Sequence, residues 1–106
     1  MSPVPRALLP DTADVAADGM LRIGGCRIDD LATAHGTPLF VYDEVHLRSR
    51  CEEAVAAFGR GRAFYAGKAF LCGAMARLAH ETGMGIDVAS GGELHVALRA
   101  GVPAAA

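Results

Sequence analysis

The residue whose type and position most clearly indicate reactive chemistry is Lys68, the only lysine in the chain. The other nine basic residues are all arginine, and Lys68 lies within the apolar run FYAGKAF at positions 64–70. Burial in such a run disfavours the charged form of a lysine. A neutral amine is a nucleophile that forms Schiff bases with aldehydes and ketones. The sequence therefore points to amine chemistry at Lys68.

Two interpretations of Lys68 follow from the residues alone. Pyridoxal phosphate (PLP) is the aldehyde that amino-acid chemistry uses most, so a buried lysine predicts a PLP site. Alternatively, Lys68 stands at the end of a strand and extends its ammonium group into water. The local sequence leaves both interpretations open.

Bulk composition excludes several classes of function. The chain has 106 residues, enough for one small domain but far below the roughly 250 of a complete (β/α)₈ barrel. Its net charge is -2 without a basic stripe, which argues against nucleic acid as a partner. No apolar run reaches membrane-spanning length, so we expect no membrane association. The N-terminus also lacks the features of a secretory signal.

The three cysteines indicate a reducing compartment. Cys26, Cys51 and Cys72 are widely spaced, an odd count without a CxxC motif. This usage fits the cytoplasm, with each cysteine serving as a small buried hydrophobe.

The first third of the chain predicts a hairpin and a short helix. Residues 1–12 are proline-rich and should be irregular. Residues 20–23 and 26–28 flank Gly24-Gly25, a pattern that favours a small hairpin or a strand followed by a turn. A helix should begin at Asp29 or Asp30, continue through His35 and end at Gly36.

From residue 39 the pattern alternates between strands and helices. Strands are expected at 39–42, 63–69 and 85–89, and the strand at 63–69 should be buried on both faces, as parallel strands covered by helices are. Asp43 should cap the first helix, and Ser90 and Glu93 form a capping box for the third. Glycines 59, 83 and 101 should end the three helices. The expected core positions are Leu47, Cys51, Val55 and Phe58 in the first helix and Leu71, Met75 and Leu78 in the second. The third helix should continue through Leu94, Ala97 and Leu98.

This alternation predicts an α/β fold with a parallel sheet. The repeats are too few to close a barrel, and the chain stops at three alanines where a further strand is expected. We therefore expect the front part of a larger protein.

Polar residues at two strand ends could share a pocket with the lysine. Asp87 lies near the end of the strand after Lys68, and Ser90 opens the following loop. Chemistry in (β/α)₈ barrels occurs at the carboxyl ends of strands, which lie about 5 Å apart. Asp87 could orient the lysine, or serve only as a turn residue. Ser90 at a helix N-terminus could accept a phosphate, or serve only as a cap. The four histidines show no metal-ligand spacing, so no metal site is predicted.

The ordered segments resemble the family of diaminopimelate decarboxylases. The resemblance rests on YAGKAF at 65–70 and GIDVASGGEL at 85–94, with upstream agreement at IGGC (23–26) and GTPLFVYDE (36–44). The match extends from about residue 15 to residue 103. The lysine segment alone is moderately specific, whereas the ordered set is strong.

The resemblance implies a fold and an activity. The fold would be a partial (β/α)₈ TIM barrel, alanine-racemase-like, formed by residues 37–106, with residues 1–36 belonging to a β-domain. Lys68 would form the Schiff base with PLP. Asp87 and Ser90 are candidate cofactor contacts because of their positions at the neighbouring strand end, and not because of the resemblance. The reaction would convert meso-2,6-diaminopimelate to L-lysine and CO₂ in lysine biosynthesis, in a homodimer of the full-length enzyme.

Two other functions stay open at this stage. Another basic amino-acid decarboxylase of the same fold, acting on ornithine or arginine, would carry a similar lysine segment. An inactive fragment could keep the scaffold without chemistry. The family's remaining cofactor and substrate contacts come later in the chain than Ala106, so we expect residues 1–106 alone to be inactive.

Overall fold

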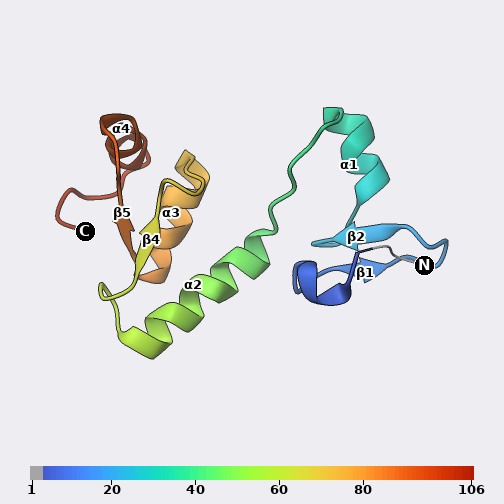
Figure 1. The fold of residues 1–106 in the computed structure, drawn as a ribbon, viewed down its shortest axis with the longest axis horizontal. Coiled ribbons are helices and arrows are strands. Elements are labelled where there is room, and N and C mark those ends of the chain that lie inside the picture. The colour runs from blue at the N-terminus through green and yellow to red at the C-terminus, as the bar shows by residue number, and fades with distance from the viewer. Residues whose placement is uncertain (1–3) are drawn as a thin grey trace. The chain divides into compact units, whose positions relative to one another are not determined.

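The structure is a computed structural model that describes residues 4–106 (Figure 1). The chain divides into two compact units, one ending at Leu47 and the other comprising Arg48–Ala106. Each unit has its own small sheet.

The first unit is built on a three-stranded antiparallel sheet. A 3-10 helix, η1 (Arg6–Leu8), precedes strands β1 (Asp14–Val15), β2 (Leu21–Ile23) and β3 (Cys26–Arg27). The strand order is β1-β2-β3. The glycines at positions 24 and 25, with φ of 59° and 80°, form the two-residue turn between β2 and β3. Because both turn residues need positive φ in such a hairpin, the glycine pair explains the turn. The predicted hairpin is confirmed, whereas β1 was not predicted.

Helix α1 (Ile28–His35) follows directly from β3. It begins one residue before the predicted start and ends at Gly36, whose φ of 81° is open to glycine at little cost. This prediction is therefore confirmed.

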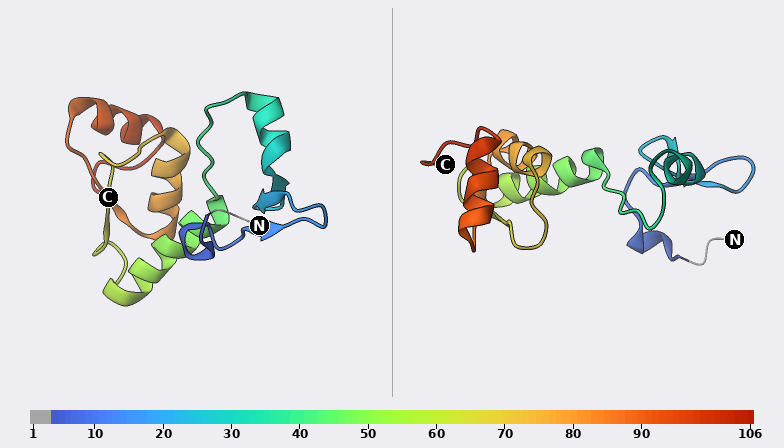
Figure 2. Two further views of the ribbon diagram at one scale, coloured as in Figure 1. Left: turned by 45° about the vertical axis from the view of Figure 1, so that its right-hand side comes forward. Right: turned by 90° about the horizontal axis from the view of Figure 1, so that it is seen from above.

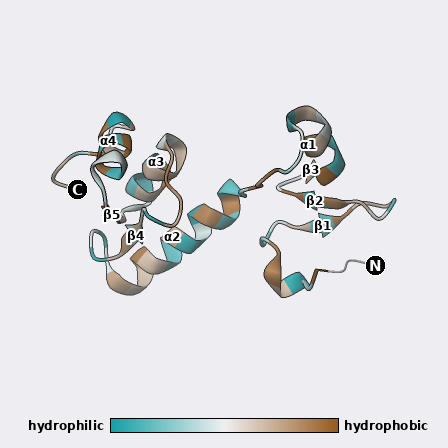
Figure 3. Ribbon diagram, turned by 45° about the horizontal axis from the view of Figure 1, so that its top comes forward, coloured by the Kyte–Doolittle hydropathy of each residue, from teal (hydrophilic) through white to brown (hydrophobic). Residues whose placement is uncertain are grey.

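The predicted strand at residues 39–42 is wrong. The two sheets of the described chain consist of β1-β2-β3 and β4-β5, and neither includes this segment. Phe40 is 88% exposed. A strand needs a hydrogen-bonded neighbour, and apolar residues alone do not supply one. Figure 3 shows this hydrophobic stretch as irregular chain leading into α2.

Helix α2 (Glu44–Phe58) begins at the predicted cap and ends before Gly59. The Asp43 carboxylate accepts a hydrogen bond from the Val45 amide at 3.2 Å, which confirms its capping role. Of the four predicted core residues only Cys51 is buried, while Phe58 is 67% exposed. The helical spacing therefore identified which residues share a face of α2, but not how much of that face other residues cover.

The second unit contains the strand–helix repeats. Strands β4 (Phe64–Ala66) and β5 (Gly85–Asp87) pair in parallel, with Ala66 opposite Asp87. Helix α3 (Gly73–Thr82) connects them, and α4 (Gly91–Arg99) follows β5. The described unit is thus a small mixed α/β structure (Figures 1 and 2). The parallel pairing is confirmed, although both strands are shorter than predicted.

The core of the second unit lies where α3 meets β5 and α4. Its centre consists of the buried residues Ala76, Ala97 and Val102. Met75 and Leu78 are buried on α3, which confirms two members of the predicted stripe.

One prediction of burial in this unit is wrong. The strand at 63–69 was expected to be buried on both faces, but Phe64 on β4 is 63% exposed. A parallel strand is buried on both faces only when layers cover both. The described residues leave Phe64 open to solvent.

Candidate functional site

Lys68 lies in a turn immediately after β4. The strand ends at Ala66, and residues 67–69 form the turn. The Gly67 amide donates to the Asp87 carbonyl at 2.9 Å, and the Ala69 amide donates to the Ala66 carbonyl at 3.2 Å. The backbone on both sides of the lysine is therefore anchored.

The side chain of Lys68 is exposed, so the prediction of a buried lysine is wrong for these residues. The physical reason is that sheet pairing stops two residues before it. The alternative interpretation, a lysine at a strand end that extends into water, describes this geometry better. An exposed primary amine is also accessible to a carbonyl compound.

Asp87 ends β5 beside the lysine turn. It pairs with Ala66 in the parallel register, and its carbonyl accepts the Gly67 amide. Its carboxylate is exposed. The backbone thus brings the carboxyl ends of both strands together, as expected. Among the described residues, however, no hydrogen bond or ion pair joins the side chains of Lys68, Asp87 and Ser90.

Ser90 forms the predicted capping box at the start of α4. Its hydroxyl oxygen accepts from the Glu93 amide at 3.2 Å. The same hydroxyl lies 3.2 Å from Oε2 of Glu93, to which it donates. Oε1 of Glu93 accepts from the Ala89 amide, also at 3.2 Å, one residue before the expected partner. Ser90 is therefore engaged as a cap.

Glu93 approaches the lysine turn, which sequence reasoning missed. A Cβ atom added at Gly67 would lie 3.1 Å from Oε1 of Glu93 and 3.2 Å from the Asp87 carbonyl oxygen. The carboxylate therefore lies against the residue that precedes Lys68. The capping-box pattern identified Glu93 as a cap, but its nearness to β4 depends on how α4 packs. An acidic group thus stands at the carboxyl end of the strands.

Tyr65 also contacts the turn. Its hydroxyl donates to the carbonyl of Phe70, across the residues that include Lys68. Tyr65 itself is half-buried.

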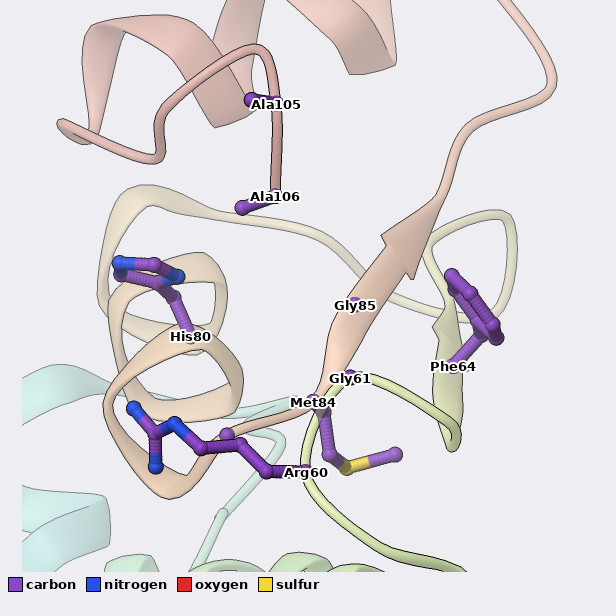
Figure 4. Close-up of a pocket in the computed structure, with 9 residues that line it drawn as sticks. Arg60, Gly61, Phe64, His80, Met84, Gly85, Ala105 and Ala106 are labelled. Carbon is purple, nitrogen blue, oxygen red and sulfur yellow. The ribbon is translucent and has the colours of Figure 1, made fainter.

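A cavity of about 390 Å³ lies at the other end of the strands. Arg60, His80 and Phe64 line it, together with Gly85 at the start of β5 (Figure 4). In parallel α/β folds chemistry occurs at the carboxyl ends, where Lys68 and Asp87 lie. The cavity is therefore separate from the predicted site. No metal-binding cluster occurs among residues 4–106, and no helix in that range could cross a membrane.

The side chains at the carboxyl ends of β4 and β5 fit the aldehyde group of PLP. Lys68 offers an accessible primary amine, the group that binds the PLP aldehyde. The exposed glycines at positions 91 and 92 leave the N-terminus of α4 open to solvent. The Ser90 hydroxyl, by contrast, is already used in the cap. The residues therefore fit attachment of the cofactor at Lys68 more clearly than phosphate binding at Ser90.

Comparison with known proteins identifies the family. The model of the pyridoxal-dependent decarboxylases, pyridoxal binding domain, matches residues 44–106, which include Lys68, Asp87 and Ser90. The chain belongs to this pyridoxal-dependent decarboxylase family. The predicted family and its cofactor are thereby confirmed.

The curated relatives are diaminopimelate decarboxylases. The enzyme of Mycobacterium leprae is 50% identical over 100 residues, covering 93% of this chain and 20% of the relative. That of Mycobacterium tuberculosis (strain H37Rv) is 52% identical over 86 residues, covering 80% of this chain and 19% of the relative. The chain thus spans about a fifth of the length of these relatives.

A solved structure shows the same fold over most of the chain. The crystal structure of the diaminopimelate decarboxylase from M. jannaschi matches this chain with a TM-score of 0.77 at 36% identity. The match covers 88% of this chain and 23% of that one.

Proposed function

We propose that this chain supplies the lysine-bearing segment of a diaminopimelate decarboxylase. The observation that carries the proposal is the identity of 50–52% to enzymes of that name. The reaction would be the decarboxylation of meso-2,6-diaminopimelate to L-lysine and CO₂. Lysine biosynthesis is the process that this reaction serves.

Lys68 is the proposed attachment point of the cofactor. When bound, PLP withdraws electrons from the substrate carbon that loses its carboxyl group. The exposed amine, anchored through the backbone of residues 67–69, supports the assignment. Asp87 is proposed to orient the amine from the neighbouring strand end. Ser90 is proposed to contact the cofactor mainly through the N-terminus of α4, which it caps.

The proposed architecture is a (β/α)₈ barrel of the alanine-racemase type. Strands β4 and β5 with α3 and α4 would be early βα units, and residues 37–106 would belong to that barrel. Residues 1–36 would contribute to a β-domain. The parallel pairing of β4 and β5 and the separate antiparallel sheet of β1, β2 and β3 support this division.

The proposed setting is a cytoplasmic homodimer that acts on an amino-acid substrate. Three free cysteines suit a reducing compartment. The family description supports an amino-acid substrate.

A second candidate is a decarboxylase of another basic amino acid. The family model that matches residues 44–106 is described only as a pyridoxal-dependent decarboxylase domain. Ornithine and arginine are therefore the competing substrates. A chain without catalytic function is the third possibility.

A chimera tests whether this segment can serve in a diaminopimelate decarboxylase. This chain replaces the matching segment of the diaminopimelate decarboxylase from Mycobacterium leprae, to which it aligns over 93% of its length. CO₂ release is then measured with diaminopimelate, ornithine and arginine. We expect release from diaminopimelate alone, and its loss in Lys68→Arg, since a guanidinium cannot replace the amine. Release only from ornithine or arginine would show that this segment does not support decarboxylation of diaminopimelate, and would refute the proposal. No release, in a folded chimera that binds PLP, would favour the inactive chain.

A further inference from the structure

The turn that carries Lys68 is closed by a side chain from the preceding strand. Tyr65 is the second residue of β4, and its hydroxyl donates to the carbonyl of Phe70. The two residues flank the lysine in sequence. The hydrogen bond therefore spans the whole segment from the strand to the point where the chain turns toward α3.

Two backbone hydrogen bonds fix the first half of this turn. The Gly67 amide is held by Asp87 on β5, and the Ala69 amide is held by Ala66. Both bonds end at or before Ala69. The hydrogen bond from the Tyr65 hydroxyl to the Phe70 carbonyl ties the second half of the turn back to β4.

We propose that Tyr65 is a positioning residue for Lys68. Its hydroxyl holds the Phe70 carbonyl, and the closed turn then sets the direction in which the lysine leaves the strand end. The inference rests on the proposed role of Lys68 as the cofactor lysine. It assigns Tyr65 no contact with cofactor or substrate.

A positioned amine matters because cofactor chemistry is sensitive to small displacements. A misplacement of about 1 Å can lower a rate by about 100-fold. Lys68 has a long, flexible side chain that is exposed in the structure. The backbone turn is therefore the part of the chain that can limit its direction.

The test replaces Tyr65 by phenylalanine in the M. leprae chimera with PLP bound. Tyr42→Phe is the matched control, because it removes a hydroxyl from the other tyrosine of the chain, outside the turn. Amide hydrogen exchange is followed at Ala69 and at Gly85. Gly85 donates to the Ala63 carbonyl at the opposite end of the strands, so it reports general loosening of the sheet.

In Tyr65→Phe we expect exchange at Ala69 to rise about fivefold, the factor for loss of one hydrogen bond. Exchange at Gly85 should stay unchanged. The kcat should fall between about tenfold and 100-fold with KM within about twofold, the pattern of lost positioning rather than lost binding. Tyr42→Phe should change none of these quantities. Equal exchange at Ala69 in both variants, or a fall in kcat without it, would overturn the inference.

Borohydride reduction of the parent chimera separates this inference from the proposed function. A pyridoxyl group on another residue refutes the role of Lys68, and the inference with it. A pyridoxyl group on Lys68 with unchanged Ala69 exchange in Tyr65→Phe refutes the inference alone. If Tyr65→Phe does not fold, p-aminophenylalanine at position 65 keeps the ring and a donor. It should restore Ala69 protection, and failure to do so in a folded chimera overturns the inference.

Discussion

Thr12→Val should loosen the start of α2, because Thr12 connects two parts of the first unit. The Thr12 hydroxyl donates to Oδ2 of Asp43 and accepts from the Gly24 amide at 2.8 Å. Asp43 is only 8% exposed and caps α2 through Val45. Valine has nearly the same shape as threonine but can neither donate nor accept. The variant therefore leaves a buried carboxylate with one partner fewer.

The size of the effect follows from the kind of hydrogen bond that is lost. A hydrogen bond to a charged group contributes about 1.5–3 kcal/mol, and a neutral one about 0.5–1.5 kcal/mol. The bond from Gly24 is exposed, so it adds little. We expect the local opening free energy to fall by about 2–3 kcal/mol. At tenfold for each 1.4 kcal/mol, this is a rise of roughly 30- to 140-fold in exchange.

The assay is native-state hydrogen exchange of the Val45 and Leu47 amides in the chimera. Both amides donate to Asp43, Val45 to its side chain and Leu47 to its carbonyl. Thr37→Val, at an exposed position, is the matched control. If Val45 and Leu47 exchange no faster in Thr12→Val than in Thr37→Val, the hydroxyl only fills space and the reasoning is refuted.

Three further predictions concern the helix cap, the thiols and acid stability. Ser90→Ala should destabilise α4 by about 0.5–2 kcal/mol through its lost cap, measured as faster amide exchange in that helix; weaker PLP binding with unchanged exchange would instead favour phosphate contact at Ser90. Iodoacetamide should modify the exposed Cys72 readily and the buried Cys51 only after denaturation, because burial raises the pKa of the Cys51 thiol; equal labelling by mass spectrometry would contradict this. The Arg27 guanidinium lowers the pKa of Asp18 in the folded state. The ion pair therefore stabilises the folded sheet fully at pH values above the unfolded pKa of Asp18, about 4. This stabilisation is lost as the pH falls through the lower pKa of the folded state. Arg27→Gln should remove this pH dependence from the amide hydrogen exchange of β2 and β3. An unchanged pH profile of exchange in the variant would refute the prediction.

Features set by neighbouring residues were predictable from the sequence. The Gly24-Gly25 turn needs positive φ at both positions, and only glycine adopts such φ freely. Asp43 and Ser90 place oxygen acceptors on free amides within three residues along the chain. These interactions depend on little beyond the local sequence, which is why they appear where expected.

Features that need a distant partner were predicted poorly. The segment at 39–42 is apolar enough for a strand, but its pairing depends on another strand edge. Phe58 has helical spacing for a core position, yet it is 67% exposed. The burial predicted for Lys68 failed for a related reason, since the sequence did not show where pairing of β4 with β5 would stop. Glu93 was recognised as a cap, but its approach to Gly67 depends on the packing of α4.

The contrast between Lys68 and its surroundings bears on how the proposed site is organised. The side chain that would carry the chemistry is exposed, while the backbone around it is tied to β5 through Gly67 and to β4 through Ala69. Glu93 adds a carboxylate beside the same turn. The backbone of this turn is therefore held by hydrogen bonds, whereas the Lys68 side chain is exposed. An amine held in this way can reach a cofactor without first rearranging the strand ends, which is why Tyr65 and the turn it closes are better targets for testing the site than the lysine alone.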